Sequence, residues 1–195
     1  CALPICRARE DAEALYQQVM AIEEQNPFAH RITPGGHRMS VAMTNCGDFG
    51  WSVDSRGYQY EQQDNLNGRR WPPMPPLFRT LAQQAALEAG FPGFNPDACL
   101  LNRYEPGAKL TLHQDKDEKD MRQPIVSVSL GLPAVFQFGG FERGDATQRV
   151  LLEHGDIVVW GGPSRLRYHG ILPLKPGVHP LVGAWRYNLT FRRAF

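Results

Sequence analysis

Three side chains in this sequence are of types that could together hold a metal ion. His113 and Asp115 are separated by one residue, and His169 stands further along the chain between Tyr168 and Gly170. Residues two apart on an extended strand point to the same face, so His113 and Asp115 could both face a barrel mouth. Two imidazoles and one carboxylate on one face form the ligand set of non-haem iron(II) sites with open positions. The pattern therefore predicts an iron-dependent oxygenase.

The spacing of His113 and Asp115 also occurs by chance in many chains. The alternative is that these histidines are ordinary surface or core residues. The remaining histidines fall in loops or turns: His30, His37, His154 and His179. His169 is therefore the natural candidate for the third ligand.

The end of the chain carries a row of polar side chains with the period of a strand. Four even-numbered residues share one face, namely Arg186, Asn188, Thr190 and Arg192, while Tyr187, Leu189 and Phe191 face the other way. Two inward arginines are costly unless anions meet them, and a dicarboxylate that chelates the metal would meet both. The alternative is a strand with a solvated polar face. Asn102 and Tyr104 form a similar same-face pair that could complete the pocket.

The bulk composition fits one globular domain. The chain has 195 residues, of which 42% are hydrophobic and 21% are charged. We expect a cytoplasmic protein, because there is no apolar run of membrane-spanning length and no signal-peptide core. The chain begins with Cys1 rather than Met, so we expect the natural N-terminus and any targeting information in it to be missing.

The cysteines and charges narrow the class of protein further. The four cysteines are scattered and form no Cys-x-x-Cys pair, which favours reduced thiols, with Cys46 and Cys99 buried and inert.

The net charge of +1 gives no overall nucleic-acid signature. Cations nevertheless dominate after Asp156, whereas acidic residues gather at 115–120. Such a distribution could serve an anionic chain that carries a cationic target, or it could be an ordinary mixed surface.

The first half of the chain predicts two helices and a loop-rich segment. Leu15, Val19 and Ile22 have helical spacing, so residues 8–25 should form a helix that Asn26 and Pro27 end. Residues 77–89 should form a second helix, which Gly90 caps. Residues 30–74 are rich in glycine and aromatic residues, which suits short strands and surface loops rather than a packed core.

The second half predicts a β-barrel. Short β-rich segments, separated by turn signals, cover residues 98–104, 110–114, 125–130, 134–138, 149–152, 156–160, 167–171 and 185–192. About eight short strands point to a sandwich or a jelly roll, with the two helices against one outer face. We therefore expect residues 1–96 to form the helices and a lid and residues 97–195 to form the barrel core, within one compact unit.

Several motifs together resemble those of the AlkB family of alkylated-DNA repair dioxygenases, in its bacterial form. The similarity runs from about residue 25 to the end of the chain. Its motifs lie at residues 33–36, 39–47, 51, 102–118, 127–133, 136–140, 155–161 and 186–192. Two places depart from the family pattern, Asp48–Phe49 and Phe141–Glu142. The resemblance implies a mainly β fold, the double-stranded β-helix (a cupin-like jelly roll), with an N-terminal extension that carries a nucleotide-recognition lid at residues 30–70.

The resemblance also implies cofactors and site residues. The family uses iron(II), 2-oxoglutarate and dioxygen. His113, Asp115 and His169 would be the metal ligands. The 2-oxoglutarate carboxylates would be clamped by Arg186 and Arg192 with help from Asn102, Tyr104 and Asn188. The substrate contacts would be Trp51, which stacks on the damaged base opposite His113, Tyr58 at the nucleotide or its phosphate, Asp117 at the base edge, Glu118 beside it, and Arg143.

The implied chemistry agrees with these residue types. 1-Methyladenine and 3-methylcytosine are cationic, so the carboxylates of Asp117 and Glu118 favour them over undamaged bases, and an aromatic face adds cation–π attraction. A damaged base pair is also cheaper to open. In this family, hydroxylation of the methyl group is coupled to decarboxylation of 2-oxoglutarate, and formaldehyde is released.

Three other functions remain open at this stage. The same chemistry could act on RNA, which nothing in the sequence separates from DNA. A cupin-like binding module without catalysis would need no paired arginines. A nucleic-acid-binding protein with a structural metal would need a closed set of four ligands, and we find three. We expect a monomer that binds alkylated DNA, single-stranded or with a flipped base, and no membrane.

Overall fold

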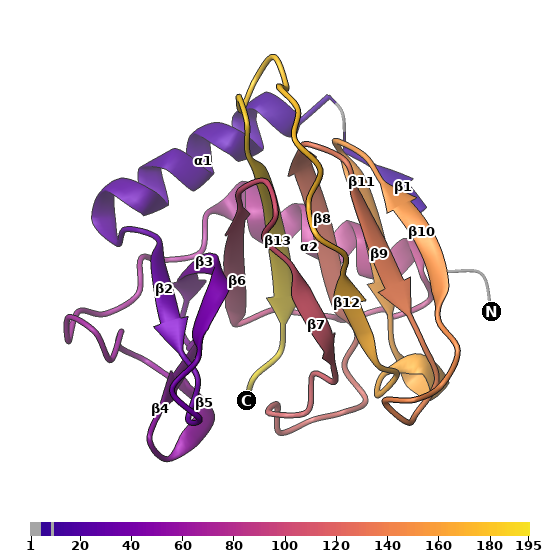
Figure 1. Cartoon of the computed structure of the whole chain (residues 1–195), viewed down its shortest axis with the longest axis horizontal. Coiled ribbons are helices and arrows are strands. Elements are labelled where there is room, and N and C mark those ends of the chain that lie inside the picture. The colour runs from indigo at the N-terminus through magenta and orange to yellow at the C-terminus, as the bar shows by residue number, and fades with distance from the viewer. Residues whose placement is uncertain (1–4, 9) are drawn as a thin grey trace.

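The computed structural model describes residues 5–8 and 10–195 (Figure 1). The helices are α1 (Ala12–Gln25), α2 (Pro76–Glu88) and the short 3₁₀ helix η1 (Gly162–Ser164). The strands are β1 (Ile5–Arg7), β2 (Ala29–Ile32), β3 (Arg38–Gly47), β4 (Gly50–Asp54), β5 (Gly57–Glu61), β6 (Ala98–Tyr104), β7 (Leu110–His113), β8 (Ile125–Gly131), β9 (Ala134–Phe138), β10 (Gln148–Leu152), β11 (Asp156–Trp160), β12 (His169–Ile171) and β13 (Arg186–Arg192).

The strands form two facing sheets and one separate hairpin. The larger sheet has the order β1-β11-β8-β13-β6-β3-β2, and the smaller one has the order β10-β9-β12-β7. Neighbouring strands in both sheets run antiparallel. Strands β4 and β5 pair only with each other and stand beside the open edge at β2 and β3 (Figure 1). This is the predicted mainly β, jelly-roll architecture.

Two apolar clusters hold the layers together. One lies between the sheets and takes residues such as Val41, Tyr104 and Phe136 from opposite sides. The other joins the outer face of the larger sheet to both helices and includes Leu189 and Phe191 of β13. The two helices therefore cover one face of the barrel, as expected (Figure 1).

Both helices end at the signals in the sequence, whereas α1 begins at Ala12 rather than at the predicted residue 8. Leu15, Val19 and Ile22 are buried on one side of α1, which stops before Asn26 and Pro27. Helix α2 starts at Pro76, where the missing N–H is not needed. Gly90 follows the end of α2 with φ of +89°, a left-handed conformation that favours glycine.

The strand prediction was accurate in the second half and wrong for one element in the first. All eight expected segments after residue 97 contain a strand. Residues 38–47, however, form the longest strand, β3, and the last seven of them are buried. The strand is buried because it pairs with β6 from Ala42 to Gly47 and contributes side chains to both apolar clusters. The part of the predicted lid that stands apart from the two barrel sheets is thus β4, β5 and the following loop.

The pairing of β3 with β6 also bears on the division of the chain. Strands β2 and β3, before residue 97, share one sheet with β6, β8 and β13. The boundary between residues 96 and 97 therefore divides the sequence but not the larger sheet, because both parts of the chain contribute strands to that sheet.

Cys46 and Cys99 are buried free thiols and lie opposite each other on β3 and β6. Cys1 and the side chain of Cys6 lie outside what the structure describes. Within the described residues, neither helix is long and apolar enough to cross a membrane.

Candidate metal and co-substrate site

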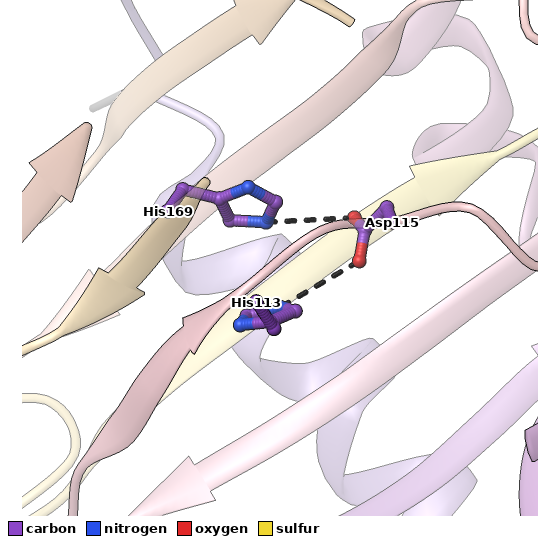
Figure 2. A group of neighbouring side chains, drawn as sticks. All are labelled: His113, Asp115 and His169. Carbon is purple, nitrogen blue, oxygen red and sulfur yellow. Dashed lines mark ion pairs between the residues drawn. The ribbon is translucent and has the colours of Figure 1, made fainter. Parts of the chain in front are cut away.

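His113, Asp115 and His169 converge at one end of the smaller sheet (Figure 2). His113 ends β7 and lies opposite His169, the first residue of β12. Asp115 follows two residues after His113, beyond the end of the strand, so the loop rather than strand alternation turns it inward. Its two oxygens lie 3.6 Å from Nε2 of His113 and 3.7 Å from Nε2 of His169. The candidate ligand atoms all lie within 4.8 Å of one another.

Both imidazoles are oriented for metal binding. Nδ1 of His113 lies 2.9 Å from the carbonyl oxygen of Thr111, and Nδ1 of His169 lies 3.1 Å from that of Arg167. A carbonyl can only accept, so Nδ1 carries the proton and the Nε2 lone pair faces Asp115. Burial and the neighbouring His169 lower the pKa of His113 to about 4, which keeps it neutral. Two imidazoles oriented in this way beside an ionised carboxylate fit a divalent cation such as iron(II).

Asp115 is buried and remains ionised. Burial alone would raise the pKa of Asp115, but the charge of Arg192, together with interactions with His169 and His113, outweighs burial and holds the pKa well below its ordinary value. Arg192 donates from Nη2 and Nε to the same carboxylate oxygen, at 2.7 and 3.1 Å. A charged candidate metal ligand therefore lies directly beside the predicted co-substrate clamp.

The polar row of β13 faces the cavity, as the sequence predicted. Its four even-numbered members line the cavity, whereas Tyr187, Leu189 and Phe191 pack against the helices. Asn188 donates to Ser127 at 2.7 Å and accepts from Thr190 at 2.9 Å, which fixes the middle of the row. The row is buried, so the solvated-face alternative is wrong.

Arg186 is buried, and two of its donor atoms are unpaired within the part of the chain that the structure describes. Its side chain is 1% exposed, and Nη2 donates to Ser129 at 3.0 Å. Nε and Nη1 have no hydrogen-bond partner among the residues that the structure describes. The guanidinium carbon lies 4.9 Å from the ring centroid of the buried Tyr104. Unpaired buried donors of a cation are costly, so the site fits an anionic ligand such as a carboxylate of 2-oxoglutarate.

A cavity of about 610 Å³ connects these groups. Asn102 and Tyr104 of β6 line it, together with the metal residues and the row of β13. Trp51, Tyr58, Asp117 and Arg143 also line it. A cavity of this size can hold a co-substrate and part of a second ligand.

The lid places an aromatic pair over the cavity. The rings of Trp51 on β4 and Tyr58 on β5 stack with centroids 5.4 Å apart. Nε1 of Trp51 donates to Asp117 at 3.1 Å. Burial raises the pKa of Asp117, although the bond from Trp51 opposes the shift. Arg143 donates to the carbonyl oxygen of Leu112 and lies 5.2 Å from the ring of Tyr168, across the cavity mouth.

Glu118 is the one predicted substrate residue that does not line the cavity. Its side chain is 2% exposed and accepts a hydrogen bond from Tyr60 at 2.7 Å and one from Arg165 at 2.8 Å. Nε of Arg192 lies 3.3 Å from the oxygen that Tyr60 contacts. Sequence reasoning did not find Tyr60 or Arg165 as partners, since neither carries a spacing that joins it to Glu118.

Comparison with known proteins places this geometry in context. The model of the 2OG-Fe(II) oxygenase superfamily matches residues 4–192. The chain is 61% identical over 183 residues to the alpha-ketoglutarate-dependent dioxygenase AlkB of Salmonella typhimurium, covering 94% of this chain and 85% of that protein. It is 34% identical over 125 residues to the nucleic acid dioxygenase ALKBH1 of Mus musculus, covering 64% of this chain and 32% of that one. A solved structure, that of OsALKBH1, has a TM-score of 0.86 at 27% identity and covers 99% of this chain and 98% of that one.

Proposed function

The chain belongs to the 2OG-Fe(II) oxygenase superfamily, and within it we propose that the protein repairs DNA by oxidative removal of methyl groups from alkylated bases. The observation that carries the proposal is the arrangement of three groups around one cavity. The metal triad lies beside a buried arginine with unpaired donors, and both lie beneath an aromatic lid that contacts Asp117. Each group serves one part of the reaction.

We assign the metal and co-substrate roles as follows. His113, Asp115 and His169 would hold iron(II), and Arg186 and Arg192 would bind the two carboxylates of 2-oxoglutarate. The supporting residues would be Asn102, Tyr104 and Asn188. Bound there with dioxygen, iron(II) and 2-oxoglutarate supply the oxidising chemistry that hydroxylates a methyl carbon, yielding succinate and carbon dioxide. The hydroxymethyl group then leaves the base nitrogen as formaldehyde.

The protein's own residues select and orient the base. We propose that the flipped base stacks between Trp51 and His113, which confines its methyl group near the metal triad. The carboxylate of Asp117 would face the base edge and favour the cationic 1-methyladenine and 3-methylcytosine over neutral bases. Tyr58 and Arg143, at the cavity mouth, would contact the nucleotide and its phosphate. The lid would also keep water from the reacting carbon.

The finer assignments extend this proposal. We propose that single-stranded DNA or a flipped base is preferred, since the cavity admits a base only outside its stack. RNA is the alternative substrate, because no contact here depends on the sugar. We further propose a monomer that acts in the cytoplasm, where buried free thiols such as Cys46 and Cys99 stay reduced.

Formaldehyde release tests the function directly. Oligonucleotides with a single 1-methyladenine or 3-methylcytosine, in DNA and in RNA, are incubated with protein, iron(II) and 2-oxoglutarate. We expect formaldehyde and succinate in equal amounts from methylated DNA, and no formaldehyde from the unmodified control. Release from RNA alone would replace DNA with RNA as the substrate. Succinate without formaldehyde on every lesion would contradict the demethylase proposal.

A further inference from the structure

We propose that Glu118 is a positioning residue that fastens the lid to the co-substrate clamp, so that lid closure and 2-oxoglutarate binding reinforce each other. The proposal deepens the proposed function and rests on it for the identity of the co-substrate. It replaces the direct contact with the base that the sequence suggested for Glu118. We call the contacts of Tyr60, Glu118, Arg165 and Arg192 the lid latch.

Burial and charge at Glu118 support a structural connection. A buried carboxylate requires partners, and Glu118 has one from each of three segments. Tyr60 comes from the lid strand β5, Arg165 follows η1, and Arg192 ends β13. These partners occupy both carboxylate oxygens, so Glu118 has little capacity left to recognise a base.

On the lid side, a bound base would leave the hydrogen bond between Tyr60 and Glu118 in place. Two side chains of the lid hairpin bond to the acidic segment after β7: Trp51 to Asp117 and Tyr60 to Glu118. A base stacked on Trp51 and read by Asp117 would compete with the first bond. The second bond lies outside the cavity lining and does not conflict with the base. Burial raises the pKa of Tyr60 well above its ordinary value, so the phenol keeps the proton that it donates.

On the clamp side, the latch reaches both the co-substrate and the metal loop. Tyr60 and Nε of Arg192 meet the same oxygen of Glu118, at 2.7 and 3.3 Å. Arg165 bonds the other oxygen and also donates to the backbone carbonyls of Asp115 and Gln123. Glu118 therefore contacts both Arg192 of the clamp and Tyr60 of the lid, and Arg165 fixes the segment that carries Asp115 and Glu118.

This connection has a thermodynamic consequence. If 2-oxoglutarate fixes Arg192, it also fixes Glu118 in the position that Tyr60 needs, which favours the closed lid. By linkage, a closed lid must strengthen 2-oxoglutarate binding by the same factor. Removing the phenol hydroxyl should break the coupling, leave the hairpin and the clamp folded, and weaken 2-oxoglutarate binding by the lost factor.

Amide hydrogen exchange of residues 50–61 tests the latch without nucleic acid. The full chain is loaded with Mn(II), which replaces iron without turnover, and measured with and without saturating 2-oxoglutarate. In the wild-type protein we expect 2-oxoglutarate to slow exchange in this hairpin by at least about fivefold. In Tyr60→Phe the slowing should fall below about twofold, and by the same linkage the affinity for 2-oxoglutarate should fall by the factor that the slowing loses, about 2.5-fold or more. Tyr58→Phe, a matched change on the same strand, should keep the wild-type slowing.

Glu118→Gln separates a positioning role from contact with the base. The variant keeps the size of the side chain but loses the charge that orients Arg192. We expect it to lose the slowing of exchange and to bind 2-oxoglutarate at least about fivefold more weakly. A variant with normal 2-oxoglutarate affinity and weaker binding only to methylated oligonucleotide would overturn the latch in favour of base contact.

The outcomes also keep the two proposals apart. Unchanged slowing in Tyr60→Phe, or none in the wild-type protein, would overturn the latch whatever the substrate is. Failure of formaldehyde release would overturn the proposed reaction and leave the exchange result intact. If Glu118→Gln does not fold, Tyr60→Phe still decides, since it removes a single hydroxyl group.

Discussion

Strand β13 and the lid hairpin both carry residues of the site, but they are held in place by different forces. Strand β13 lies between β6 and β8 and pairs with both along its length. Strands β4 and β5 pair only with each other. Backbone register therefore fixes Arg186 and Arg192, whereas Trp51 and Tyr58 depend on how the hairpin is fastened to the barrel. A buried central strand is rigid, and a two-stranded hairpin is marginal by itself.

Polar side chains fasten the hairpin and its loop. The amide of Asn45, on β3, both donates to and accepts from the backbone of Trp51, at 3.0 Å in each case. Asn65, in the loop after β5, donates to the carbonyl oxygen of Val53 at 2.9 Å. Arg31 on β2 pairs with Asp64 at 2.8 Å, where both side chains are buried. Changes in the sheet should therefore affect the reaction at the metal triad, while changes in the lid should affect which substrate reaches the cavity.

Loss of a predicted metal ligand on the sheet should have the largest effect of all, and the affected quantity should be the reaction rate. We expect His113→Ala and Asp115→Ala to lower 2-oxoglutarate turnover by more than about 100-fold, beyond the usual effect of losing an outer-shell partner. Circular dichroism should show an intact fold. His179→Ala, at a histidine that does not line the cavity, is the control and should keep activity. Full activity in either ligand variant would remove the iron assignment.

Loss of a clamp arginine should come next in size. Arg192→Ala removes a bidentate cation, so we expect the apparent KM for 2-oxoglutarate to rise by at least about 30-fold, with binding of methylated oligonucleotide less affected. The neighbouring Arg193 is partly exposed, donates to the carbonyl oxygens of Asn95 and Phe195 and lies 3.6 Å from Asp97, which makes Arg193→Ala a matched control. An unchanged KM in Arg192→Ala would exclude this arginine from the clamp.

The sequence predicted the sheet side of the site well because its signals are periodic. The alternation along β13 separated the polar row from Leu189 and Phe191. The register of β13 with β6 and β8 then fixes where each of these residues lies in the barrel. The basic character after Asp156 was harder to interpret. Arg165, Arg186 and Arg192 are all buried, and two of them, Arg165 and Arg192, pair with buried carboxylates rather than lie on a surface. A charge count cannot distinguish these two uses.

The lid could not be predicted in the same detail, because its contacts join residues far apart in sequence. Tyr60 meets Glu118 across 58 positions, and Arg31 meets Asp64 across 33. Glycine-rich and aromatic composition indicated loops, and it hid β3, whose burial depends on pairing with β6. No local pattern carries such information, since burial of a strand is a property of its neighbours.

Loss of the stacking ring tests the lid side of the comparison. Trp51→Ala should weaken binding of methylated oligonucleotide by about 5- to 100-fold, because stacking contributes about 1–3 kcal/mol per base. Uncoupled decay of 2-oxoglutarate should change much less, since the indole of Trp51 bonds to Asp117 rather than to the predicted metal ligands or the clamp arginines. Trp51→Phe keeps an aromatic face and should recover most of the affinity. Equal loss of binding and of uncoupled decay would contradict the division between lid and sheet.

Asp64, which pairs with Arg31, is the buried anchor of the lid loop. Its loss should have the smallest effect on 2-oxoglutarate turnover, and its effect on stability should depend on pH. Burial would raise the pKa of Asp64, but hydrogen bonds from Arg31 and Asn26 outweigh it and hold the pKa below its ordinary value. The ion pair therefore stabilises the fold above the pKa of an unfolded carboxyl, about 4, and this stabilisation is lost as the pH falls further. Asp64→Asn should lower the free energy of unfolding by about 1.5–3 kcal/mol at pH 7, with little change in 2-oxoglutarate turnover.

Urea unfolding at two pH values checks the sign of this effect. The difference between wild-type protein and Asp64→Asn should be large at pH 7 and should shrink at about pH 3, below the pKa of an unfolded carboxyl, where unfolding of the wild-type protein takes up a proton. Asp54→Asn is the matched control, because hydrogen bonds from Arg56 also lower the pKa of Asp54, yet that pair is exposed at the hairpin tip. Solvent screens an exposed pair, so the control should shift the unfolding midpoint little at either pH. Equal shifts of the unfolding midpoint in both variants would mean that burial does not set the strength of the Asp64 ion pair. The proposed contrast between the buried lid loop and the exposed hairpin tip would then be wrong.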